Sequence, residues 1–248
     1  MRTSALVVCF VFFTGLHAQD SLPSATPSQA AVLLRQALRS KATGPEASAA
    51  ALLAIREHGL TPEGAIAKVL GSALRHKDPE VRLAALAALR GNVAPESLGA
   101  LLGAADAAEL LADEHAAAEY YLALGQKGDA RALPVLVEGL HVSRGSPVVN
   151  ARILAIGHIR SPDSVAALMR FLKSGGSGSG KAKRSRNPHM RDLATALTVL
   201  TGESFGADAT AWIRWWTEHE HGYALPDFPP ELPKRTKRTW SSLWNDKA

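Results

Sequence analysis

Cysteine is nearly absent from this chain of 248 residues, which contains one, Cys9, within an apolar run near the N-terminus. Cys9 does not stand at the end of that run, where a lipoprotein acceptor would be found. We expect the run to be removed, so the mature chain would have no disulfide, no thiol nucleophile and no thiolate metal site. Such a protein depends on burial alone, which fits a bacterial envelope protein better than a small secreted disulfide scaffold.

The N-terminus lacks an apolar run long enough to span a bilayer and instead has the pattern of an export signal. Arg2 precedes the apolar residues 5–13, and Leu16 and Ala18 occupy the cleavage-site positions. We expect residues 1–18 to be a signal peptide and residues 19–27 a polar linker. A short membrane anchor is the alternative. The predicted location is periplasmic or secreted, with no transmembrane span in the mature chain.

Excess charge and catalytic motifs are also scarce. The formal net charge is +5, far from the strong field of a dedicated nucleic-acid binder. The sequence contains no Gly-x-Ser-x-Gly elbow and no His-Glu-x-x-His, and the run at 175–181 lacks phosphate-loop spacing. His219 and His221 would point about 200° apart on a helix, so they cannot bind one metal ion from a regular helix. We predict no catalytic residue, cofactor, metal or small-molecule substrate.

Strand patterns are missing, whereas Ala and Leu recur at helical spacing, which predicts an all-α fold. The chain repeats itself when Arg90, Gly125 and Gly157 are superposed, at steps of 35 and 32 residues. Residues 51–74 form an earlier unit and a further unit follows. The pattern predicts five helix pairs and a lone helix near residues 28–40.

Each unit has the same helix boundary signals. Asp78 is a predicted N-cap followed by Pro79 at the first helical position, where its missing N–H costs nothing. The first helix is expected to end near a small or turn-forming residue, and proline is expected to open the second. These positions are Gly91, Gly125 and Gly157 for the glycines and Pro62, Pro95 and Pro162 for the prolines. Two short helices cannot bury their apolar stripes alone, so neighbouring units must stack.

The stretch DPEVRLAALAALRG, residues 78–91, resembles the first helix of bacterial HEAT-like repeats, which carry Asp-Pro-x-Val-Arg-x-x-Ala-Ala-x-x-Leu. The resemblance covers roughly residues 46–221 and is degenerate outside this unit. It implies a right-handed α-solenoid of about five HEAT-like hairpins, placed at residues 28–221, with a concave face lined by second helices. Such folds host binding and scaffold roles more often than reactions.

Three tryptophans fall within residues 209–222, ATAWIRWWTEHEHG. Helical spacing places them on a shared face, and a stacked array needs a closing surface, so we predict a C-terminal cap. An aromatic ligand platform is the alternative. The stretch from Leu200 also resembles a terminal unit of exported bacterial HEAT-like proteins. The cap residues are Phe205, Asp208 (as an N-cap), Trp212, Trp215 and Trp216.

Basic residues gather in a Gly/Ser-rich insertion, residues 174–187, and in a Pro-rich tail, residues 222–248. Both could contact an anionic polymer or surface, or be solvated segments only. The tail is expected to be extended, packed back through Phe228 and Trp240 or otherwise disordered. The eight candidate residues are Lys181, Lys183, Arg184, Arg186, Lys234, Arg235, Lys237 and Arg238.

The sequence therefore favours a non-enzymatic protein-binding or scaffold solenoid of the bacterial cell envelope, whose partner protein binds the concave face. One alternative is a binder of anionic polymers through the insertion and tail. Another is an enzyme or enzyme accessory, because HEAT-like units also occur in bilin lyases and DNA glycosylases. A glycosylase needs a pocket carboxylate beside an exposed tryptophan, for which Asp208 near Trp212 is the nearest candidate.

Overall fold

The computed structural model describes residues 27–39, 64–92, 94–140, 146–175 and 187–244. The expected signal peptide, the first helix of the first expected pair and the four cations of the insertion lie outside these residues. All regular structure within them is helical, which confirms the all-α prediction. The chain divides into two compact units, Met1–Ala123 and Leu124–Ala248.

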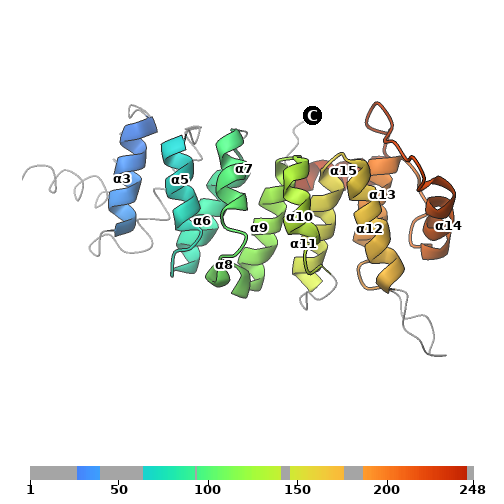
Figure 1. The fold of residues 1–248 in the computed structure, drawn as a ribbon, viewed down its shortest axis with the longest axis horizontal. Coiled ribbons are helices and arrows are strands. Elements are labelled where there is room, and N and C mark those ends of the chain that lie inside the picture. The colour runs from blue at the N-terminus through green and yellow to red at the C-terminus, as the bar shows by residue number, and fades with distance from the viewer. Residues whose placement is uncertain (1–26, 40–63, 93, 141–145, 176–186, 245–248) are drawn as a thin grey trace, which may run out of the picture. The chain divides into compact units, whose positions relative to one another are not determined.

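The first unit begins with α3 (Pro27–Arg39), which matches the predicted lone N-terminal helix. It is followed by α5 (Gly64–Ala73), α6 (Pro79–Arg90), α7 (Pro95–Leu102), the short α8 (Ala108–Ala112) and α9 (Glu114–Gln126). The unit boundary falls inside α9. Helix α5 packs on α3, α6 and α7 (Figure 1), and these helices bury Leu34, Leu70 and Leu89 almost completely.

The helix boundary signals read from the sequence are largely confirmed. The Asp78 side chain accepts a hydrogen bond from the backbone N–H of Glu80, and Pro79 is the first residue of α6. Helix α7 begins at Pro95 and α12 at Pro162, as the repeat predicts. Asp113 accepts from the N–H of Ala116 at 3.0 Å and so stabilises the start of α9. Pro62 lies outside the described residues.

The second unit begins within α9 and continues with a 3-10 turn (Ala130–Ala132), α10 (Leu133–Val137), α11 (Ser146–His158) and α12 (Pro162–Gly175). It ends with α13 (Met190–Thr201), α14 (Ala209–His219) and α15 (Lys234–Trp244). First helices contact first helices, as α11 contacts α13, and second helices contact second helices, as α12 contacts α14 (Figure 1). Apolar side chains at the α11–α13 contact, among them Ile156 and Leu197, are fully buried.

A buried arginine lies in a first helix of each unit and contacts the end of the preceding second helix. Arg82 of α6 is 6 % exposed and donates to the carbonyl oxygens of His76 and Lys77, just after α5. Arg152 of α11 is 3 % exposed and donates to the carbonyls of Leu136 and Glu138 at the end of α10. Each guanidinium satisfies carbonyl groups that the end of the preceding second helix leaves without intrahelical partners.

The first helices end near the repeated glycines, as predicted, but only one of the three is a helix cap. Gly91 is the C-cap of α6. Gly125 and Gly157 instead lie inside α9 and α11, one residue before the last. A Cβ atom on Gly125 would lie 2.5 Å from Cα of Ala155, and one on Gly157 would lie 2.5 Å from Cβ of Ala196. These two glycines are needed for close helix packing and not for a turn.

The prediction of an extended tail is wrong for its last part. Residues 234–244 form α15, in which Trp240 and Trp244 are buried, while Phe228 is 82 % exposed. Trp240 therefore packs back on the fold as one alternative stated, and Phe228 does not. The tryptophans recur four residues apart on one face, so burying that face stabilises a helix despite the four prolines before it. No helix within the described residues is both long and apolar enough to cross a membrane.

Candidate functional site

An open groove lies between α5 and α7, the second helices of two successive hairpins in the first unit. Its volume is about 510 Å³. Most lining residues are small, including Ala67, Gly71, Gly99, Ala100 and Gly103. The two helices meet at Gly71 and Ala100. A Cβ atom built on Gly71 would lie 3.4 Å from Cβ of Ala100, which is an ordinary van der Waals contact. Gly99 faces open space, since no atom lies within 4 Å of a Cβ built there.

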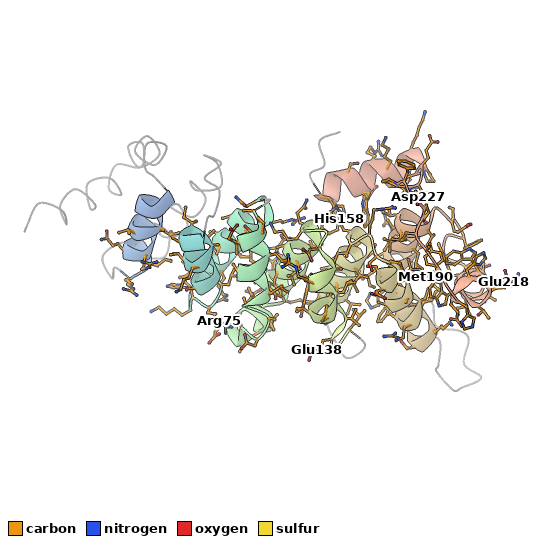
Figure 2. The ribbon with its side chains drawn as sticks, turned by 45° about the horizontal axis from the view of Figure 1, so that its top comes forward. Arg75, Glu138, His158, Met190, Glu218 and Asp227 are labelled. Carbon is orange, nitrogen blue, oxygen red and sulfur yellow. The ribbon has the colours of Figure 1, made fainter. Side chains whose placement is uncertain are left out.

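Charged side chains of both signs border this groove. Arg75, labelled in Figure 2, donates to the carbonyl oxygen of Gly103 at 2.8 Å and forms an ion pair with Asp106. The hydrogen bond from Arg75 holds the pKa of the Asp106 carboxyl below its usual range. Lys68 and Glu96 also line the groove and are exposed, and no ion pair within the described residues includes either. The groove thus offers a floor of small side chains and a charged edge.

The predicted cap residues of the C-terminus form one aromatic cluster on α14. Trp212 is fully buried and Trp216 is 7 % exposed, while Trp215 is half-buried. The Phe205 ring meets Trp212 edge-on at 4.9 Å between centroids, and Tyr223 packs edge-on against Trp216 at 5.5 Å. Burial of two of the three indoles agrees with a packing role more closely than with an open aromatic platform.

The carboxylate proposed for a glycosylase-like site is already engaged. Asp208 accepts hydrogen bonds from the backbone N–H groups of Thr210 and Ala211 at 2.9 and 3.0 Å, which confirms the predicted N-cap. The Trp212 ring beside it is buried, and its Nε1 donates to the carbonyl oxygen of Gly206. The pair therefore does not present a free carboxylate next to an exposed indole.

The four cations of the tail lie on α15, whose inner side packs on the second unit. The Trp244 ring packs at a tilt against His158, labelled in Figure 2, with 4.2 Å between ring centroids. The carbonyl oxygen of Trp244 accepts a hydrogen bond from Nε2 of Gln126. Trp240 lies over Gly157, where a Cβ would come within 3.2 Å of its ring. The structure brings together four cations that are all exposed: Lys234, Arg235, Lys237 and Arg238. Those of the insertion lie outside the described residues.

A second group of ionisable side chains lies at the start of α13. His189 shares a hydrogen bond with Oδ1 of Asn150 on α11, and its ring packs near Phe171. Burial lowers the pKa of His189 and raises the pKa of the neighbouring Asp192. Elsewhere in the second unit, just after α9, burial lowers the pKa of Lys127 to about 8. No group of three or more metal-ligating side chains forms within the described part of the chain.

Sequence reasoning missed the groove and the last helix for different reasons. The groove depends on which small residues of α5 and α7 face each other, which the repeat pattern alone does not fix. Helix α15 did carry a signal, because Thr236, Trp240, Leu243 and Trp244 follow a helical spacing that the preceding prolines obscured.

Comparison with known proteins identifies no relative: no family model, no curated protein and no solved structure matches this chain.

Proposed function

We propose that this chain is a non-enzymatic binding protein of the bacterial cell envelope, built as a HEAT-like α-solenoid that holds a partner protein on its second helices. The stacking of first helices on first helices and second helices on second helices supports the solenoid architecture. The buried Arg82 and Arg152, which both donate to carbonyl oxygens at the end of the preceding second helix, support the HEAT-like resemblance. The export pattern of residues 1–18 supports the location.

The groove between α5 and α7 is the single observation that carries the binding proposal. It joins two successive hairpins, which is where a stacked repeat offers a continuous surface. Its floor of glycine and alanine admits a bulky apolar side chain or a closely approaching helix. Lys68 and Glu96 at its edge favour a segment with an acidic residue near the first and a basic residue near the second.

Gly99 allows a direct test, because a side chain added there enters open space without disturbing the packing. Tagged full-length chain is used to capture proteins from envelope extract, and the Gly99→Trp and Gly99→Ala variants are compared with the wild type. The indole of Gly99→Trp would fill part of the groove, so a specific partner should be lost. Gly99→Ala adds one methyl group and should retain it.

Retention of the same partners by Gly99→Trp would contradict the proposal. Circular dichroism of both variants checks that the fold is intact, so a loss of binding reports on the groove. Deleting residues 174–187 in a parallel sample asks whether the basic insertion takes part. An unchanged set of partners after that deletion would show that the insertion is not needed for binding.

A further inference from the structure

We propose that the exposed cations of α15 form a docking surface for an anionic phospholipid membrane. This surface, the cationic face, consists of Lys234, Arg235, Lys237 and Arg238. It belongs to the second unit, and its argument and test do not depend on the groove in the first unit.

The two buried tryptophans determine which side of α15 points outward. Trp240 is 8 % exposed and Trp244 is 1 % exposed, so their side of the helix faces the fold. At about 100° per residue, Arg235 and Arg238 project on the opposite side and Lys234 lies on the flank. Lys237 shares the side of the tryptophans, but it lies in the first turn and is exposed. All four are exposed, and the outward side continues into Ser242 without an acidic residue. The first turns of the helix therefore present a cluster of positive charge, from which Arg235 and Arg238 point away from the fold.

The charges on this face are unbalanced within the described part of the chain. No described ion pair includes any of the four cations. The nearest acidic residues in the sequence, Asp227 and Glu231, still leave residues 227–238 with an excess of two positive charges. The cations lie in the first turns of α15, whose first turn contains no acidic residue. There they oppose the helix macrodipole and repel one another at three- and four-residue spacings. An anionic surface relieves both effects.

An exposed aromatic side chain accompanies the cationic face. Phe228 lies six residues before α15 and is 82 % exposed. Its segment is held at two points, because Arg160 donates to the carbonyl oxygen of Pro226 at 2.6 Å and Pro230 packs against Gly202. Phe228 thus projects from an anchored segment that precedes the basic helix directly in the sequence. Basic residues with a neighbouring apolar side chain are the combination by which peripheral proteins bind lipid interfaces.

The same geometry favours a lipid surface over a single-stranded nucleic acid. Proteins that bind single strands combine cations with exposed aromatic rings on which bases stack. Here the indoles of α15 are turned inward, against His158 and Gly157, so within residues 227–244 only the Phe228 ring is left for stacking. The outward side carries only cations and hydroxyl groups. It matches an extended plane of negative charge, to which each Lys or Arg contributes roughly fivefold in binding at low screening.

Vesicle co-sedimentation of the full-length chain tests the proposal. One set of vesicles contains equal parts of phosphatidylglycerol and phosphatidylcholine, and the other contains phosphatidylcholine alone. The test variant replaces all four cations of the cationic face by Gln. A control variant replaces Arg35, Arg39, Lys77 and Arg214 by Gln, which removes the same charge from exposed positions elsewhere.

The wild type should bind the anionic vesicles, and binding should weaken with added salt. The test variant should lose roughly 100- to 1,000-fold in that binding, and the control variant should lose far less. Phe228→Ser should lose roughly five- to tenfold and keep the salt dependence of the wild type. Binding by the apolar residues 5–13 would appear equally with phosphatidylcholine alone and is thereby subtracted.

Equal binding by the test variant and the wild type would overturn the proposal, and so would an equal loss in the control variant. Binding to heparin with no preference for anionic vesicles would also overturn it, in favour of a soluble polyanion. Circular dichroism would reveal a test variant that fails to fold. We expect it to fold, because its Gln residues remove charge repulsion in the first turns of α15 and should leave the melting temperature unchanged or raised. Gly99→Trp should bind vesicles as the wild type does, so this test and that of the groove can fail separately.

Discussion

Replacing Gly157 by Ala tests the close packing of first helices in the second unit. The new Cβ atom would lie 2.5 Å from Cβ and 2.9 Å from Cα of Ala196 on α13, and 3.2 Å from the Trp240 ring. A rotamer change cannot relieve contact with a backbone atom, so α13 must move away from α11. Overpacking of this kind costs about 1–3 kcal/mol, and more where the backbone has to shift.

The same substitution has an opposing favourable effect, because Ala in a helix is about 1 kcal/mol better than Gly. We expect the steric cost to exceed this gain and to leave a net loss of roughly 1–2 kcal/mol in the free energy of unfolding. For a chain of this length, the melting temperature should fall by roughly 2–8 °C. The assay is thermal unfolding followed by circular dichroism, with reversibility checked on cooling.

Gly99→Ala is the matched control, since both glycines are replaced inside a helix but only Gly157 meets a neighbour. With no atom within 4 Å of its Cβ, Gly99→Ala should gain about 0.5–1 kcal/mol and raise the melting temperature. A Gly157→Ala protein as stable as the Gly99→Ala protein would refute the reasoning. It would mean that α11 and α13 do not approach as closely as the structure indicates.

Three further perturbations test other parts of the account. Trp240→Ala should remove about 3–5 kcal/mol of stability and weaken the near-ultraviolet dichroism of the packed indoles, because this ring on the inner side of α15 is buried; unchanged spectra would contradict the docking of that helix. Asp208→Ala should cost about 1 kcal/mol in chemical denaturation, because two backbone N–H groups lose their acceptor, and Asp208→Asn should restore most of it. Burial lowers the pKa of His189, so on acidification the unfolded chain binds this proton before the folded chain does, and the folded state loses stability as pH falls below about 6.5. The loss of melting temperature on acidification should therefore be smaller in His189→Gln. An identical pH profile in that variant would refute this assignment.

The elements that sequence reasoning predicted best are those set by local chemistry. The Asp78–Pro79 start of α6, the proline starts of α7 and α12 and the Asp208 N-cap each depend on a residue that acts within one helical turn. Such signals can be read from a single segment. The helical nature of residues 27–39 followed from the same local spacing.

The features that were missed depend on contacts between distant segments. Gly125 and Gly157 do lie near helix ends, as glycine locally indicates, but their packing role is set by Ala155 and Ala196 on neighbouring helices. Helix α15 was read as an extended tail because its helical spacing is short and its stability comes from indoles packed against His158 and Gly157. The groove likewise arises only when α5 and α7 are side by side.

The central claim is that the groove between α5 and α7 holds a partner protein, and a site-specific crosslink tests it most directly. Ser72 lines the groove on α5, and its hydroxyl donates to the carbonyl oxygen of Lys68 four residues earlier. Thr217 on α14 is exposed and makes the same four-residue hydrogen bond, to Ile213, so Thr217→Cys is a matched control for Ser72→Cys.

Cys9 is the chain's only native cysteine, so replacing it by Ser leaves each variant with a single thiol for a short photoreactive label. After irradiation in envelope extract, the account predicts a crosslink to one specific protein from position 72 and none to that protein from position 217. No crosslink from position 72, or the same products from both positions, would contradict it.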